Sequence, residues 1–340
     1  MEEKEVPWIN WTNFYDRIYK TYEQNRRIKK KKGTKCIGFG LCELYSLKKK
    51  GGKKMERLDY EQFKVVLTTK LEELLLKSKK PYGYKKQVVH KVNQDLDAIS
   101  MIGENVKMSP TLYFNNMYDY YNDTDATIEE LALKAFETML EGINQTEITE
   151  ELPDKEKFME NIFFQVINTE KNKTYLLEVP HREYLDLSII YRYAVSLSDN
   201  DIATATINYI LMDEFKLTEE ELYKAAYKNT RKILKPKVTS PGFTGLYMIT
   251  NDLNIFGANG ILYKDIVAKE AKKLGTDIYL IPSSIHEFLI QPVSNTLKPK
   301  DLKEIIKDAN EHVIDPEDYL SDSLYIYKLE TDTIEIVEVK

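Results

Sequence analysis

The chain has 340 residues, of which 42% are hydrophobic and 11% aromatic, so it can bury the core of one large domain or of two ordinary ones. No run of about eighteen apolar residues occurs, which excludes a membrane-spanning helix, and the start MEEKEVPWIN lacks the pattern of a secretory signal. Cys36 and Cys42 are too few to staple a fold of this size and have no companion metal ligands nearby. We therefore expect a cytoplasmic protein without a bound metal or other cofactor.

The net charge of −6 is unevenly distributed. Residues 1–54 carry 15 Lys and Arg against 6 Asp and Glu, and the other residues carry 34 against 49. The acidic remainder argues against a nucleic-acid partner for residues 55–340, because such binding needs basic groups facing phosphates. The basic run KKKGGKKMER at 48–57 has two interpretations. It is either a tail for nucleic acid or anionic surfaces, or a translated ribosome-binding site that makes Met55 the biological start.

Apolar residues at spacings of three and four predict helices, and local signals mark their ends. Thr127 with Glu130, and Thr218 with Glu221, have the spacing of capping boxes, and Gly275 is placed to end a helix. Residues 109–121 are expected to form a short strand that runs into a helical turn. The predicted helices cover residues 59–77, 127–143, 154–168, 218–233, 266–275 and 299–312.

Runs rich in β-branched and aromatic residues predict strands, of which the last two form a hairpin. They cover residues 85–93, 97–102, 174–179, 184–197, 245–250, 277–282, 286–292, 323–330 and 333–339. A linker is expected at 148–156 and a loop at 234–245, where prolines and glycines gather. This order predicts an α+β fold: two lobes, 55–150 and 151–340, each of mainly antiparallel sheet with packed helices, behind a basic extension at 1–54.

Several blocks of sequence agree with one family in order and spacing. They include SPTLYFNNMYDYY at 109–121, PHREYLDLSIIYR at 180–192, MDEFKLTEEELYKAAYKNT at 212–230, LYMITND with the following GA at 246–258, LGTDIYLIPSSIHE at 274–287 and DPEDYLSDSLYIY at 315–327. With them the chain resembles, over about residues 58–335, an uncharacterised family of clostridial gut bacteria, often carried on conjugative elements and prophages. The resemblance implies a mobile-element context and no established activity.

The stretch IPSSIHEFLIQP at 281–292 is the first candidate site. Ser283 or Ser284, His286 and Glu287 are the residue types of a nucleophile, its base and an orienting carboxylate. On a strand, however, Ser284 and His286 share one face, and Ser283 and Glu287 the other. We therefore favour a turn after Pro282 in which the serines satisfy backbone groups, followed by a core strand.

Further candidates lie in the second lobe. His181 and Asp186, with His286, have the chemistry of a metal site or an acid–base set, although their spacing matches no known ligand motif. An ion pair of Arg182 or Arg192 with Asp186 is the favoured alternative, because charges in an apolar segment need partners. The candidates for ligand binding are Arg182, Arg192, Asn251, Asp252 and Ser283. Gly257 and Gly260 follow a strand, but FGANG is not a phosphate-binding loop.

These observations lead to three functional hypotheses. The first is a non-catalytic binding protein of a mobile element that acts on a host or phage protein or on a small molecule, without a membrane. The second is a hydrolase-like enzyme that uses His286, His181 and a carboxylate. The third is a nucleic-acid protein that binds through residues 1–54.

Overall fold

The computed structural model describes residues 57–104, 106, 110–145, 153–198, 202–239, 246–293 and 298–339. The chain divides into two compact units, which are treated separately: unit 1 spans 1–89 and 95–151, and unit 2 spans 90–94 and 152–340. Met55, Cys36, Cys42 and the expected extension at 1–54 lie outside the described residues. Among the described helices, none is long and apolar enough to cross a bilayer.

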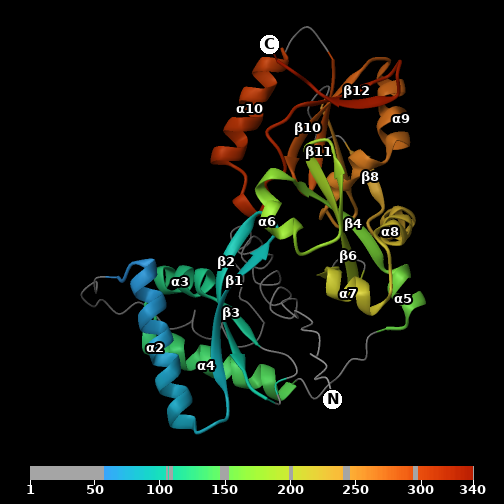
Figure 1. Cartoon of the computed structure of the whole chain (residues 1–340). Helices are drawn as coiled ribbons and strands as arrows, with labels where there is room; N and C mark the ends of the chain where they lie inside the picture. Colours follow the sequence, from blue (N-terminus) through green and yellow to red (C-terminus); the bar gives the residue numbers. More distant parts are fainter. Residues whose placement is uncertain are drawn as a thin grey trace. The chain divides into compact units, whose positions relative to one another are not determined.

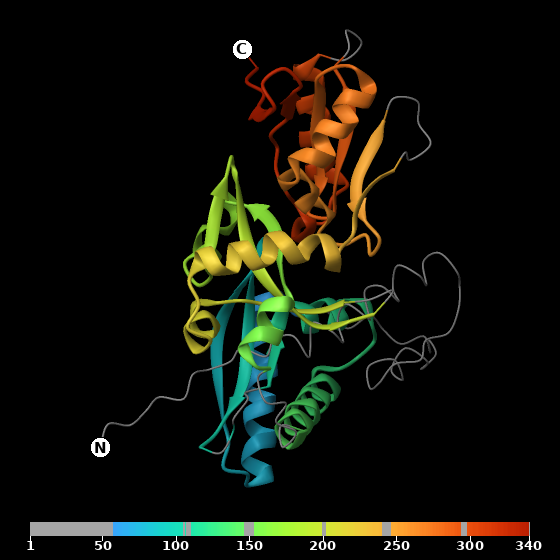
Figure 2. The same cartoon turned by 90° about the vertical axis from the view of Figure 1, so that its right-hand side faces the viewer.

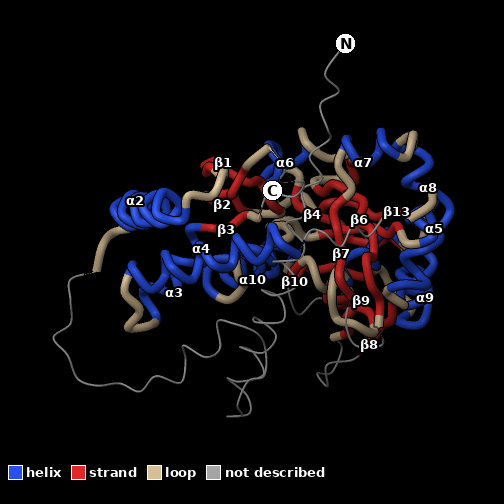
Figure 3. The backbone as a smooth tube through the Cα atoms, turned by 90° about the horizontal axis from the view of Figure 1, so that it is seen from below, coloured by secondary structure: helices blue, strands red, loops and turns tan. Residues whose placement is uncertain are grey.

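Unit 1 contains a three-stranded sheet in the order β1-β2-β3, with helices packed on one face (Figures 1 and 3). Ile99 and Met101 of β2 face the helices and are fully buried, while Leu96 and Ala98 point to the other face. The described elements are α2 (Tyr60–Ser78), β1 (Gly83–Lys91), β2 (Gln94–Ile102), β3 (Thr111–Tyr113), α3 (Phe114–Asp123) and α4 (Ile128–Gln145).

Capping boxes begin both long helices of unit 1, and the one at Thr127 is the one that the sequence predicts. Asp59 accepts a hydrogen bond from the N–H of Gln62 and closes a capping box before α2. Thr127 and Glu130 make the reciprocal bonds before α4. Phe63, Leu67 and Leu71 of α2 are completely buried at helical spacing. The predictions of both helices are confirmed, and so is a strand that runs directly into α3.

Unit 2 contains two antiparallel sheets with helices. In the first sheet β6 is central: β4 lies on one edge, and β5 and β7 lie one after the other along the opposite edge. Helix α8 crosses this sheet (Figure 2). The elements around it are α5 (Lys155–Glu160), β4 (Ile162–Asn168), η2 (Glu170–Asn172), α6 (Lys173–Leu176), β5 (His181–Tyr184), β6 (Leu187–Leu197), β7 (Ile202–Thr206), α7 (Tyr209–Glu214) and α8 (Glu219–Ile233).

The second sheet of unit 2 has the order β13-β12-β10-β11-β9-β8 and is covered on both faces. Ile278 and Leu280 of β10 pack in the core that contains α9, while Tyr279 between them packs with α10 (Figure 1). The elements are β8 (Pro236–Thr239), β9 (Tyr247–Asn251), η3 (Gly257–Leu262), α9 (Lys264–Leu274), β10 (Ile278–Ser284), β11 (Glu287–Pro292), α10 (Pro299–His312), η4 (Pro316–Asp318), β12 (Tyr325–Lys328) and β13 (Thr333–Ile336).

Side chains form hydrogen bonds with the backbone groups on the outer edge of β4. Asn259 of η3 donates to the carbonyl of Phe164 at 2.6 Å and accepts from the N–H of Val166 at 2.9 Å. The hydroxyl of Thr230 accepts from the N–H of Phe164 at 3.0 Å. Because buried backbone groups need partners, these bonds allow β4 to end its sheet inside the protein.

The α+β fold class is confirmed, and three element predictions are wrong. Residues 154–168 do not form one helix: α5 ends at Glu160, and the apolar run that follows is the fully buried strand β4. Residues 174–179 are not a strand, since the short helix α6 occupies their start. The expected loop at 234–245 contains strand β8, whose Pro236 is tolerated because β8 lies at the sheet edge.

Candidate functional site

The stretch from Ser283 to Glu287 forms the tight end of the β10–β11 hairpin. Ser284 pairs with Glu287 across the ladder, so the strand continues through Pro282 and both serines, and the turn is made by Ile285 and His286. The expected turn at Pro282 and the serines is therefore wrong by about two residues. The register shifts between Pro282 and Ser284, which is a bulge that tightens this end of the hairpin.

Both ring nitrogens of His286 are used inside the protein. The backbone N–H of Phe256 donates to Nδ1 at 3.2 Å, and Nε2 lies 3.0 Å from a carboxylate oxygen of Asp318. An Nδ1 that accepts a hydrogen bond carries no proton, so Nε2 carries it and donates to Asp318. The side chains of His286 and Asp318 are 26% and 16% exposed. We call His286, Asp318, Ser284 and Phe256 the turn cluster.

The serines do not form a nucleophile–base pair with the imidazole. The hydroxyl of Ser284 accepts from the backbone N–H of His286 at 3.1 Å, and Ser283 donates to Glu287 at 3.0 Å. The carboxylate that orients His286 is Asp318, 32 residues further along the chain. These bonds hold the turn in place. Neither serine hydroxyl is bonded to the imidazole of His286, which is the contact that nucleophilic catalysis by a serine needs.

The other expected catalytic residues have separate partners. His181 begins β5, and its Nδ1 lies 3.0 Å from the carbonyl oxygen of Val179. Asp186, in the turn between β5 and β6, accepts from Ser321 at 2.7 Å and from Tyr325 at 2.6 Å. Burial, with Asp186 beside it, raises the pKa of the Tyr325 phenol far above its usual range. In the described parts of the chain, no three His, Cys, Asp or Glu side chains come together as metal ligands.

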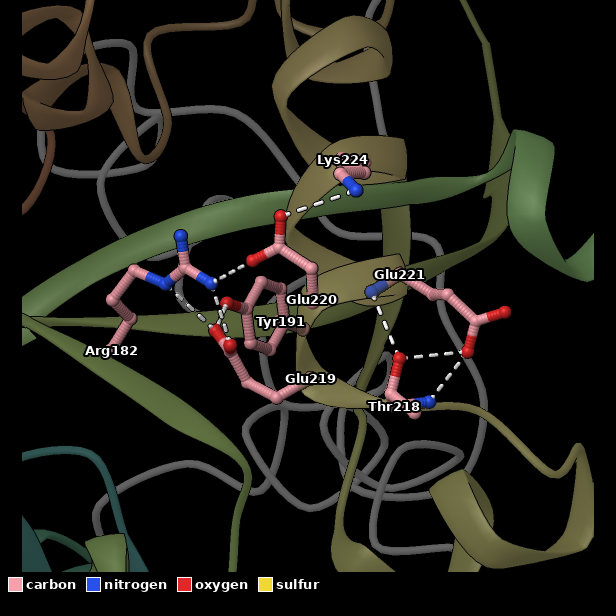
Figure 4. Close-up of polar contacts among 7 residues, drawn as sticks. All are labelled: Arg182, Tyr191, Thr218, Glu219, Glu220, Glu221 and Lys224. Atoms are coloured by element: carbon pink, nitrogen blue, oxygen red, sulfur yellow. Dashed lines mark hydrogen bonds and ion pairs between the residues drawn. The ribbon is translucent and has the colours of Figure 1, made fainter.

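A second polar cluster surrounds the start of α8 (Figure 4). Arg182 of β5 donates from Nε and Nη2 to the two carboxylate oxygens of Glu219, at 3.1 and 2.7 Å, and Nη2 also reaches Glu220 at 2.7 Å. The phenol of Tyr191, from the centre of β6, donates to Glu219 as well. The guanidinium lies 3.8 Å from the centre of the Tyr223 ring. We call these five residues the helix cluster.

Contacts within the helix cluster shift the pKa values of Arg182, Tyr191 and Glu220. Hydrogen bonding to Glu219 raises the pKa of Arg182, and Arg182 in turn lowers the pKa of Glu220. Burial, followed by the hydrogen bond to Glu219, raises the pKa of Tyr191 far above its usual range. The expected ion pair of Arg182 with Asp186 is therefore wrong, because Arg182 pairs with the acidic first turn of α8.

Arg192 holds three strands together. It is 6% exposed, and its guanidinium donates to Gln165 of β4 at 2.9 Å and to Thr204 and Thr206 of β7 at distances from 2.6 to 3.2 Å. It also lies 5.1 Å from the centre of the Phe256 ring. These contacts place Arg192 in the interior of the sheet, away from the ligand-binding role expected for it.

Asn251 ends β9 and Asp252 follows it, and both side chains have partners within the protein. The buried amide of Asn251 donates to the carbonyl of Ile255 and accepts from the N–H of Leu253 at 3.0 Å, which closes a local turn. Asp252 forms a surface ion pair with Lys237 at 3.1 Å.

The glycines after this turn serve packing. A Cβ on Gly257 would lie 2.2 Å from the carbonyl oxygen of His286, and one on Gly260 would lie 2.0 Å from Ile249. Short helix η3 therefore presses directly against the sheet. A cavity beside it, lined by Thr230, Asn251 and Asn259 among others, has room for about one water molecule.

Sequence reasoning missed both true carboxylate partners in these clusters. Asp318 lies in DPEDY, a polar turn just ahead of the last hairpin, and Glu219 is the first residue of a predicted helix. The capping box at Thr218 predicts the start of α8, and the helix dipole favours acidic residues in a first turn. That signal accounts for the position of Glu219 but does not identify Arg182 as its partner.

Comparisons with known proteins place the chain in a family. It belongs to a family of unknown function, DUF5688, whose model matches residues 60–241 and 240–329. The resemblance to an uncharacterised family expected over about residues 58–335 is thereby confirmed. No curated protein and no solved structure matches the chain.

Proposed function

We propose that this protein is a non-catalytic binding protein of a mobile element that acts on a protein of the host or of a rival element, for example by countering a defence system. The mobile-element context rests on the sequence resemblance. The binding role rests on one observation, an exposed apolar corner of unit 2, and is supported by the closed turn cluster, in which the imidazole has no nitrogen left for a substrate.

The apolar corner consists of Leu177, Tyr209 and Ile210. Their exposed fractions are 79%, 41% and 43%, and the N–H of Tyr209 donates to the carbonyl of Glu178 at 3.4 Å, which brings the two segments together. Exposed apolar side chains that gather from separate segments are typical of protein-binding surfaces, because their burial is favourable only when a partner covers them.

Native mass spectrometry of the full chain, gently isolated with its partners, tests this proposal. We expect a protein partner in a fixed stoichiometry that is lost in a Leu177→Glu, Ile210→Glu variant. An Ile305→Glu variant is the matched control, since Ile305 is 55% exposed on α10 outside the corner. A complex that survives the corner substitutions, or turnover of a substrate that depends on His286, would refute the proposal.

The second candidate function, a hydrolase-like enzyme, has one supporting observation. The hydrogen bond between His286 and Asp318 supplies the histidine–carboxylate pair that such an enzyme needs. A panel of ester and phosphoester substrates tests it. Hydrolysis that His286→Ala and Asp318→Asn both abolish, while His181→Ala leaves it intact, would establish the enzyme and assign the reaction to this pair.

A further inference from the structure

The turn between α2 and β1 concentrates positive charge in an otherwise acidic body. Residues 77–91 contain six lysines and no Asp or Glu, whereas acids outnumber bases over the chain as a whole. Five of these lysines are exposed: Lys77, Lys79, Lys80, Lys85 and Lys86. We call these five residues the basic edge. Figure 1 shows α2 running down to this turn, from which β1 runs back along the sheet.

The charges of the basic edge are not neutralised within the part of the chain that the structure describes. None of its five lysines forms an ion pair with a described residue. Earlier lysines of α2 do: Lys64 pairs with Asp97 at 2.8 Å, and Lys70 pairs with Glu73 at 3.6 Å. The unpaired lysines therefore form a separate positive surface and do not belong to the mixed-charge faces seen on the other helices.

Four of the five lysines of the basic edge lie on a helix or strand or cap a helix. Lys77 lies in the last turn of α2, and Lys79 caps that helix in the left-handed region, with φ 54° and its N–H bonded to the carbonyl of Leu76. Lys85 and Lys86 lie on β1, which is the edge strand of its sheet. Successive residues of a strand point to opposite faces, so the two ammonium groups project from the two sides of this edge.

We propose that the basic edge binds the phosphate backbones of double-stranded nucleic acid without sequence preference. Lysines on both sides of a narrow edge can face the two phosphate chains that border a groove, whereas a flat anionic membrane would meet only one side. Tyr82 and Tyr84 pack against the core of unit 1. They are therefore not free to stack on the unpaired bases of a single strand.

The basic edge differs in charge from the rest of residues 55–340. The net negative charge of residues 55–340 predicts no nucleic-acid binding. That net charge, however, includes acidic surfaces that would not contact the nucleic acid. Phosphate contacts depend on the local arrangement of lysines, and contacts of this kind give binding that is strongly dependent on salt.

Fluorescence anisotropy of the full chain with a labelled DNA duplex tests the proposal. Five phosphate contacts give a slope of log K against log salt of about −4.5, so the affinity falls roughly 500-fold between about 50 and 200 mM salt. A Lys85→Gln, Lys86→Gln variant should reduce the steepness of that slope by about 1.8. Glutamine keeps the length and polarity of the side chain, and thermal unfolding verifies that the fold is unchanged.

The matched control is a Lys269→Gln, Lys272→Gln variant, which removes two exposed lysines from α9 in unit 2. It should bind the duplex as the unsubstituted protein does. Equal effects of the two double variants, or an unchanged slope in the β1 variant, would overturn the proposal. So would absence of duplex binding, tighter binding to a single strand of the same length, or binding to vesicles containing phosphatidylserine but not to the duplex.

Discussion

The turn cluster and the helix cluster satisfy their polar groups by different means. In the turn cluster a neutral imidazole joins a backbone N–H to one carboxylate, and its side chains are mostly buried. In the helix cluster a guanidinium and a phenol converge on one carboxylate near solvent, with Arg182 and Glu219 33% and 31% exposed. A concentration of catalytic residue types therefore does not itself indicate chemistry, because the polar groups of both clusters hold segments of the chain together.

The two clusters should therefore differ in how much stability they supply. A buried donor left unpaired costs its full desolvation, whereas a charged pair near water is screened and contributes little. Substitutions in the two clusters should reveal that difference.

Removing the imidazole should be most damaging. His286→Ala removes the hydrogen bonds of the imidazole with the N–H of Phe256 and with the carboxylate of Asp318, which should lower the free energy of unfolding by about 3 kcal/mol. Urea unfolding followed by circular dichroism measures it. His312→Ala is the control: His312 is exposed at the end of α10, and its loss should cost about 0.5 kcal/mol or less. Equal losses would contradict the structural role of the turn cluster.

Removing the phenol from the helix cluster should have an intermediate effect. Tyr191→Phe keeps the buried ring and deletes its hydrogen bond to Glu219, which should cost about 1–2 kcal/mol of unfolding free energy. Glu219 retains Arg182, so the carboxylate is not left unpaired. The same urea experiment applies, and a loss as large as that of His286→Ala would reverse the ranking of the two clusters.

The raised pKa of Tyr191 predicts an effect confined to alkaline solution. The folded protein holds this phenol protonated, while the unfolded chain loses the proton near pH 10, so stability is complete below about pH 10 and falls above it. Tyr191→Phe should make the decline shallower by up to about 1.4 kcal/mol per pH unit. Unfolding measured across this range checks it. His286→Ala should leave the slope unchanged, because that substitution removes no phenol.

The smallest effect is expected at Glu220, and acid should abolish it. Arg182 lowers the pKa of Glu220, so its contribution is present above the carboxyl's unfolded pKa and is lost as the pH falls through the folded one. The Glu220→Gln variant should therefore have a slightly lower free energy of unfolding than the unsubstituted protein near neutral pH. The two free energies should become equal at about pH 3. A difference that grows in acid would show that Arg182 does not stabilise the charged carboxylate.

Much of the fold could be predicted because its signals are local. Helices α2, α4, α8 and α10 have caps or helical spacing within their own residues, and Gly275 ends α9 with φ 70° as expected. Strand β4 could not be recognised, because all seven of its residues are buried and its apolar run has no alternation to distinguish it from a helix. Strand β8 could not be recognised because it begins with Pro236, which is tolerated there because β8 lies at the edge of the sheet.

The candidate site was harder to predict, because its main contacts join residues that lie far apart in the chain. The bonds within the turn, such as Ser283 to Glu287, join residues only four apart across the tight end of the hairpin. Asp318 and Asp186 find partners 32 and more than 130 residues away, and no spacing rule connects residues so distant. Only the packing of the segment around η4 on two sheets brings these groups together.

Nuclear magnetic resonance of the His286 imidazole shows whether this residue is structural and closed to a substrate. Long-range correlation of the ring protons with both ring nitrogens identifies the tautomer at neutral pH. We expect a neutral ring protonated at Nε2, with Nδ1 accepting a hydrogen bond, unchanged when an ester or phosphoester substrate is added. A ring protonated at Nδ1, with Nε2 free and responsive to such a substrate, would contradict the account and favour the enzyme.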